Sequence, residues 1–182
     1  MSRAFVKDTD DAGDALPEIP LSEHPNYVTP HGLELLRGRL DAAQARRDAL
    51  KAGEQTLAQQ SELAAVEREL RWLKARVAGA IEIDLAQQPR DRVAFGAGVT
   101  VDSAEEGERT YRIVGEDEAD VERGLVSYVS PLARALIGAR IGEEVTWQRP
   151  AGDLRVEVVA IDYGDDTVLR EAQDMDAHVR RC

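Results

Sequence analysis

Residues 29–80 read TPHGLELLRGRLDAAQARRDALKAGEQTLAQQSELAAVERELRWLKARVAGA, and this stretch decides the fold. Its apolar side chains form two series that step mostly by three and four residues, on either side of a break at Ala52-Gly53. The members are Leu33, Leu36, Leu40, Ala43 and Leu50, followed by Leu63, Val66, Leu70, Leu73 and Val77. This spacing is the seam pattern of a coiled coil. We therefore predict an antiparallel coiled-coil hairpin, which projects as an arm because each helix buries only one narrow stripe.

Local signals mark where the first helix begins and ends. Thr29 is a suitable N-cap, and Pro30 suits the first helical position. Gly53 follows the first apolar series, and glycine is common just past a helix C-terminus because it tolerates positive φ. We expect His31 to lie on the surface of the first turn and Trp72 to pack at the base of the hairpin.

The second half of the chain changes to an alternation of apolar and polar residues, which is typical of half-buried antiparallel strands. The alternating segments are Val99–Val101, Tyr111–Ile113, Val145–Trp147 and Leu154–Val158. Ser130 caps and Pro131 opens one short helix that runs to about Leu136. The fold class is therefore α + (α+β): a helical hairpin followed by a small domain of about four to six antiparallel strands around one helix.

We expect five segments along the chain. Residues 1–26 are an acidic, disordered leader, since the few hydrophobic residues there cannot offset the entropy of ordering. A partner-binding tail is the alternative for this leader. The other boundaries are 27–82 for the hairpin, 83–92 for a linker, 93–164 for the α+β domain and 165–182 for a flexible tail.

Composition limits the kinds of function that the chain can have. Lys and Arg number 23 against 35 Asp and Glu, for a formal net charge of −12, which argues against non-specific DNA binding through phosphate contacts. The single cysteine, Cys182, excludes internal disulfides and cysteine-based zinc sites. No apolar run approaches the roughly 18 residues of a membrane span. We expect a cytoplasmic protein with no membrane contact, no cofactor and no metal of its own.

Several motifs match one known family. They are Ser130-Pro131-Leu132-Ala133-Arg134-Ala135-Leu136, Pro150-Ala151-Gly152, Tyr111-Arg112-Ile113-Val114-Gly115 and Phe95-Gly96-Ala97, together with Tyr27-Val28-Thr29-Pro30-His31-Gly32-Leu33 at the start of the hairpin. In these motifs, the chain from about Tyr27 to Tyr163 resembles the Gre family of bacterial transcription elongation factors. The SPLARAL block and the PAG turn are the specific part of this resemblance, since many proteins contain a helical hairpin.

The resemblance implies an FKBP-like fold for residues 93–164 and bacterial RNA polymerase as the partner. In Gre factors the globular domain docks at the rim of the polymerase secondary channel, and the coiled coil reaches down the channel. Acidic residues at its tip help to hold the second catalytic magnesium of the polymerase, which then cleaves backtracked RNA, so the factor itself is not an enzyme. Docking would fall on Ser130, Pro131, Leu132 and Arg134, although Val129 replaces the Asp that several Gre factors carry before Ser-Pro.

The tip of the hairpin departs from the family pattern. Cleavage-stimulating members carry a Gly-Asp-x-x-Glu-Asn-Ala-x-Tyr-like segment there, whereas residues 48–55 read DALKAGEQ and offer only Asp48 and Glu54. The arm is also short by roughly two heptads, or about 10 Å at about 1.5 Å of rise per residue, as in Rnk-type relatives. Because a carboxylate binds magnesium at about 2.1 Å, we predict a factor that occupies the channel and modulates elongation, pausing or initiation without strong cleavage stimulation.

Other interpretations remain open at this point. Asp48 and Glu54 are either tip carboxylates that approach the metal, as in a true cleavage factor, or solvated charges at helix ends. Arg46, Arg47 and Lys51 either face nascent RNA or form a solvated surface. A different class is an FKBP-like peptidyl-prolyl isomerase or chaperone module, which the scarcity of aromatic residues argues against. We expect a monomer, with a free coiled-coil homodimer as the weaker option.

Overall fold

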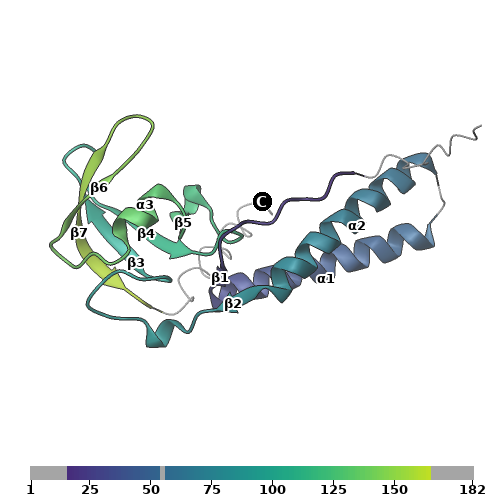
Figure 1. Cartoon of the computed structure of the whole chain (residues 1–182), viewed down its shortest axis with the longest axis horizontal. Coiled ribbons are helices and arrows are strands. Elements are labelled where there is room, and N and C mark those ends of the chain that lie inside the picture. Colours follow the sequence, from purple (N-terminus) through teal and green to yellow (C-terminus); the bar gives the residue numbers. More distant parts are fainter. Residues whose placement is uncertain (1–15, 54–55, 165–182) are drawn as a thin grey trace, which may run out of the picture.

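The computed structural model describes residues 16–53 and 56–164 of the chain (Figure 1). Helices α1 (Pro30–Ala52) and α2 (Leu57–Ala78) lie side by side and form an arm that extends away from a sheet domain. Most of the expected leader, Glu54 at the tip and the expected flexible tail lie outside the described residues. The arrangement of a helical arm followed by a β domain is as predicted.

Helix α1 begins and ends where the sequence predicts. The Thr29 hydroxyl accepts a hydrogen bond from the Gly32 N–H at 2.8 Å, and Pro30 opens the helix. The Gly53 N–H closes the last turn on the Ala49 carbonyl at 3.2 Å. Our reason for a glycine at this position was wrong, because its φ is −82° and its backbone is extended, a conformation open to any residue.

Helix α2 starts with a capping box, in which Thr56 and Gln59 satisfy each other's backbone N–H groups. All ten predicted stripe positions are buried or half-buried. Those fully buried are Leu33, Leu36, Ala43, Val66, Leu70 and Leu73. The apolar stripe that joins the two helices is therefore confirmed.

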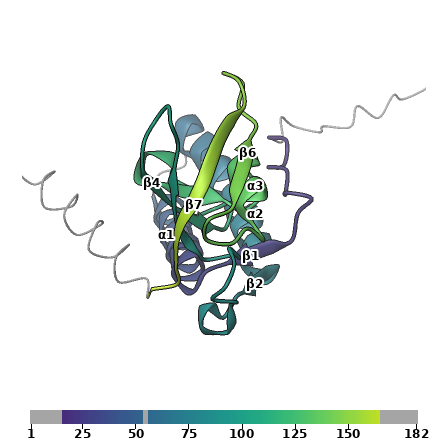
Figure 2. The same ribbon diagram turned by 90° about the vertical axis from the view of Figure 1, so that its left-hand side faces the viewer.

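The sheet domain contains a five-stranded sheet in the order β5-β4-β3-β7-β6. Its strands are β3 (Gly98–Asp102), β4 (Arg109–Val114), β5 (Leu125–Ser127), β6 (Glu144–Trp147) and β7 (Leu154–Asp162). The short helix α3 (Pro131–Leu136) has the predicted bounds and buries Leu132, Ala133 and Leu136 in the core. Figure 2 shows β6 and β7 on the side of the molecule that faces away from the arm.

The prediction of a purely antiparallel sheet was wrong at one edge, where β5 pairs with β4 in parallel. Residues 115–124, which include the 3-10 turn η2 (Val121–Arg123), carry the chain back so that Leu125 lies opposite Arg112. Parallel neighbours need such a return connection. With only three residues, β5 is too short to show an alternating pattern.

A second, two-stranded sheet closes the base of the arm. Strand β1 (Asn26–Val28) precedes α1, strand β2 (Ala80–Glu82) follows α2, and the two pair in parallel. The expected linker then contains the 3-10 turn η1 (Leu85–Gln87). His31 is buried at this base, which corrects its expected surface position, because the first turn of α1 packs against the loop that follows β4.

Residues 16–25 form an extended segment that runs beside α2 (Figure 1), and we refer to it as the strap. It belongs to the leader that we expected to be disordered. Within the described part of that leader, the backbone of Pro17 and the carboxylate of Glu18 accept hydrogen bonds from arginine side chains of α2.

Candidate functional site

The tip of the arm carries one described carboxylate in the last two turns of α1. Asp48 accepts hydrogen bonds from the Nε and Nη2 atoms of Arg47, at 2.8 and 2.6 Å. No acidic residue lies in the first turn of α2, and Glu54 falls outside the described residues. The described tip therefore presents a carboxylate that is already neutralised by its neighbour in the sequence.

The two other basic residues of the tip are held by carboxylates of the opposite helix. Arg46 contacts Glu62 at 2.5 Å, and Lys51 contacts Glu67 at 2.7 Å. The hydrogen bond from Lys51 holds the pKa of the Glu67 carboxyl below its ordinary value. These ion pairs join α1 to α2, and the two carboxylates would compete with a phosphate for either cation.

Helix α3 divides the four predicted docking residues into two pairs. The Ser130 hydroxyl accepts a hydrogen bond from the Ala133 N–H at 3.2 Å and caps the helix. Leu132 is 3% exposed and belongs to the core. Pro131 and Arg134 are exposed, and they line a shallow groove of about 430 Å³ together with Ala135, Thr146 and Gln148. Ser130 and Leu132 thus fix the helix, and Pro131 and Arg134 form its surface.

A buried ion pair at the base of the arm escaped the sequence analysis. Arg76 of α2 is 5% exposed, and its guanidinium lies 2.7 Å from Asp117 and 3.6 Å from Glu116, in the loop after β4. The Thr29 hydroxyl donates to the Glu118 carboxylate of the same loop at 2.7 Å. This contact set, which we call the junction, fastens both helices to the sheet domain. The run of three acidic residues at 116–118 was its signal in the sequence.

Aromatic rings complete the junction. Tyr27, Phe95 and Tyr128 lie with ring centroids 5.4 to 6.1 Å apart. Burial raises the pKa of the Tyr128 hydroxyl, which donates to the Pro25 carbonyl. Gly115 lets the backbones meet here, because a Cβ atom at this position would lie 2.5 Å from the Tyr27 carbonyl oxygen. The direction of the arm is therefore set by a packed, hydrogen-bonded interface.

The sheet domain offers little room at its aromatic face. Tyr111 and Trp147 meet edge to face at a centroid distance of 6.3 Å. The cavity beside them measures about 10 Å³, which is space for about one water molecule. A proline ring does not fit this cavity, and this argues against a peptidyl-prolyl isomerase pocket there.

Among residues 16–53 and 56–164, no group of three His, Cys, Asp or Glu side chains is placed to hold a metal ion. None of the helices in these ranges has the length and apolar character that crossing a membrane requires.

Comparisons with known proteins agree on one family. Residues 88–163 match the family model described as "Transcription elongation factor, GreA/GreB, C-term". The transcription elongation factor GreA of Pelobacter propionicus is 41% identical over 99 residues, which are 54% of this chain and 63% of that protein. GreA of Francisella tularensis subsp. novicida is 36% identical over 152 residues, covering 75% of this chain and 95% of that protein. The chain belongs to the GreA/GreB family. The resemblance found in its motifs is thereby confirmed.

Solved structures of Gre proteins also match this family member. GreA factor homolog 1 (Gfh1) of Thermus thermophilus covers 76% of this chain, at 22% identity and a TM-score of 0.36. A GreA/GreB factor from Nitrosomonas europaea covers 78%, at 20% identity and a TM-score of 0.38. Scores this low carry no argument about how the arm and the sheet domain are placed.

The alignment with the Francisella protein contains a difference in length. It spans 152 residues, yet 75% of the 182 residues of this Gre-family chain is only about 137. This chain thus contributes about 15 residues fewer than the alignment is long. The match to the Pelobacter protein is shorter and extends over less than two thirds of that relative.

Proposed function

We propose that this Gre-family chain binds bacterial RNA polymerase and places its arm in the secondary channel. There it modulates elongation, pausing or initiation without strongly stimulating transcript cleavage. In this proposal residues 27–82 act as an antiparallel coiled coil, residues 83–92 as a linker and residues 93–164 as an FKBP-like docking domain. The chain works as a monomer near the polymerase magnesium and has no catalytic site of its own.

Docking is assigned to the surface formed by α3 and its groove. Pro131 and Arg134 are exposed there, and the buried Leu132 with the Ser130 cap keeps them in place. An arginine beside a proline on a short, well-packed helix suits recognition of an acidic partner surface, because the guanidinium can bind a carboxylate through two hydrogen bonds.

The state of the tip carries the proposal that cleavage stimulation is weak. Asp48 accepts both hydrogen bonds from Arg47 on its Oδ1 atom, so a neighbouring cation already competes with a metal for this carboxylate. The described part of the first turn of α2 adds no acid. Arg46 and Lys51 remain candidates for contact with nascent RNA, where a phosphate would compete with the carboxylates of Glu62 and Glu67.

Arm length supports the same conclusion. A shortfall of about 15 residues in the alignment agrees in size with two missing heptads. In this proposal the missing residues belong to the hairpin, and dividing them between two antiparallel helices would shorten the arm by about 10 Å at about 1.5 Å of rise per residue. Magnesium and its carboxylate ligands lie about 2.1 Å apart. A tip that stops this far from the metal cannot supply a ligand.

A backtracked elongation complex tests the proposal. Purified chain should bind the polymerase, compete with a cleavage-competent GreA and change pause lifetimes, while releasing no short RNA 3′ fragments. Arg134→Ala should weaken binding, and Arg109→Ala on strand β4, which does not line the groove, should not. The proposal fails if the chain does not bind the polymerase. The assignment of weak cleavage fails if fragments are released and Asp48→Ala with Glu54→Ala abolishes their release.

A further inference from the structure

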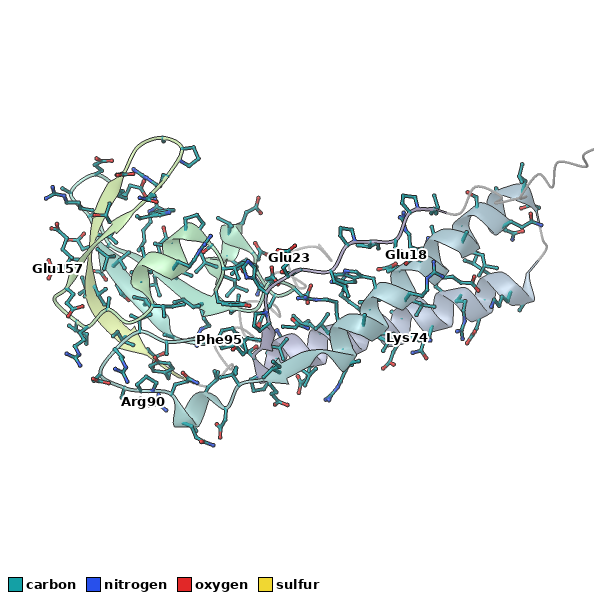
Figure 3. All side chains as sticks on the ribbon, viewed as in Figure 1. Glu18, Glu23, Lys74, Arg90, Phe95 and Glu157 are labelled. Carbon is teal, nitrogen blue, oxygen red and sulfur yellow. The ribbon has the colours of Figure 1, made fainter. Side chains whose placement is uncertain are left out.

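The strap, residues 16–25, is an ordered part of the described chain although it forms neither helix nor strand. Figure 3 places Glu18 beside α2 and Glu23 near the junction, so the strap runs along the arm. It contains Pro17, Pro20 and Pro25, and proline fixes φ in a range that favours extended chain. The three prolines therefore favour an extended conformation, which suits a segment that lies along another surface.

One end of the strap is held by side chains of α2. The Glu18 carboxylate accepts from Arg71 Nε at 2.9 Å and lies 2.6 Å from its Nη2. This hydrogen bond from Arg71 lowers the pKa of the Glu18 carboxyl. One residue earlier, the Pro17 carbonyl accepts from Arg68 Nη1 at 3.3 Å. The strap thus uses a charge and a backbone carbonyl to bind two arginines one turn apart.

The other end of the strap is held by the sheet domain. The Ser22 hydroxyl donates to Glu116 Oε1 at 2.9 Å, and the Pro25 carbonyl accepts from the Tyr128 hydroxyl. Both contacts are at the junction. The segment is therefore anchored near its attachment point to β1, and its Pro17 and Glu18 end lies over the arm.

Between these ends, Ile19 is half-buried and forms one wall of a groove on the arm. The groove has a volume of about 360 Å³ and combines apolar with charged walls. Its lining residues are Ile19, Arg39, Arg46, Glu62, Ala65, Val66, Arg68, Glu69 and Trp72. Trp72 forms part of the wall with the Arg39 guanidinium 5.5 Å from its ring centroid. Since Arg46 and Glu62 lie nearer the tip than Arg68, the groove continues past the site where the strap is held.

We propose that this arm face is a peptide-binding groove and that the strap is its resident ligand, bound in cis. The ligand class is an extended, acidic and apolar peptide with the pattern Pro-Glu-Ile of residues 17–19. Arg71 and Arg68 recognise its carboxylate and its backbone, and the wall at Trp72 takes its apolar side chain. This site is separate from the α3 surface and does not depend on polymerase binding.

The contacts of the strap are weak enough for a free peptide to replace it in the groove. Its ion pair is exposed, and exposed pairs are individually weak. Leu16 and Leu21 remain 40% and 51% exposed, so these two side chains bury little apolar surface against the arm. Its occupancy comes from the short tether to β1, which keeps the strap at a high effective concentration. A free peptide of the same pattern can therefore replace it once the cis contacts are weakened.

A fluorescein-labelled peptide of residues 16–25, followed by fluorescence anisotropy, tests the proposal on the full chain. The peptide should bind the wild-type chain weakly, because the tethered strap competes. It should bind an Ile19→Asp chain at least tenfold more tightly, since that strap no longer offers an apolar side chain to the groove. A peptide carrying the same Ile19→Asp change should not bind. Circular dichroism of the variant chain should remain that of the wild type.

Charge reversal makes the test specific. An Arg71→Glu chain should reject the wild-type peptide and bind a peptide that carries Glu18→Arg. The matched control is a Glu23→Gln chain, which removes a carboxylate that makes no ion pair among the described residues. The Glu23→Gln chain should bind the labelled peptide as weakly as the wild-type chain does.

Three outcomes overturn the proposal. The first is equal peptide binding by the wild-type and Ile19→Asp chains, and the second is an unchanged preference in the Arg71→Glu chain. The third is a wild-type chain that is a dimer in solution and becomes a monomer with Ile19→Asp. That result would mean that the groove holds the strap of a second copy rather than its own.

Discussion

Replacing Arg76 tests how firmly the arm is held to the sheet domain. Its side chain is 5% exposed and lies 2.7 Å from Asp117, which is itself 12% exposed. The change Arg76→Met keeps most of the apolar volume but leaves the Asp117 carboxylate nearly buried and without its cation. Removing one member of a buried pair costs about 3–5 kcal/mol. Because Glu116 is 23% exposed and regains water, we expect a loss of about 3 kcal/mol, at the lower end of that range.

Urea unfolding followed by circular dichroism measures this loss. The midpoint should fall while the slope with denaturant stays constant, since the folded structure exposes no more surface. Adding Asp117→Asn to Arg76→Met should recover part of the loss, because the unpaired buried charge is then removed. Arg37→Met on the exposed side of α1 is the control, with a change within about 0.5 kcal/mol. A loss below about 1 kcal/mol for Arg76→Met, or no recovery in the double variant, would refute the reasoning.

Three further predictions follow from the described contacts. Gly115→Ala should lower the free energy of unfolding by about 1–3 kcal/mol, because its Cβ would lie 2.5 Å from the Tyr27 carbonyl oxygen. Gly38→Ala in α1 should instead raise it by up to about 1 kcal/mol in the same urea assay, because its Cβ meets nothing within 4 Å and alanine favours the helix. Acid should release the strap: the contact of Glu18 with Arg71 is fully present above pH 4.5 and is lost as the pH falls through the lowered pKa of the folded state. Anisotropy of a fluorophore attached to the strap should report this step, and Glu18→Gln should remove it.

The elements that could be predicted from the sequence are those with local signals. Thr29 and Pro30 set the start of α1, and Ser130 and Pro131 set the start of α3, because capping depends on neighbours within one turn. Strands β3, β4, β6 and β7 were visible because each is long enough to alternate. Strands β1, β2 and β5 have three residues each and showed no pattern.

The contacts that could not be predicted join residues far apart in the sequence. Arg76 and Asp117 are 41 positions apart, and the strap residue Glu18 meets Arg71 across 53 positions. Both pairs looked like ordinary surface charges in the sequence. At the tip, the sequence named Arg46 as a candidate cation, but its pairing with Glu62 depends on the register of two helices around the turn. The charge pattern of the sequence therefore identified candidate residues but not the residues with which they form ion pairs.

The junction separates the two parts of the proposed function. Arg76 and Thr29 fix the base of the arm to the loop after β4, so the position of the tip is set by the lengths of α1 and α2 rather than by a swivel at the base. In the proposed function, the chemistry of the tip belongs to residues near Asp48, whereas docking is assigned to α3, more than 70 positions later in the chain. Neither region contacts the other in the described structure. This layout supports the proposal, because a change in the tip or in the length of the arm would leave the residues of α3 in place.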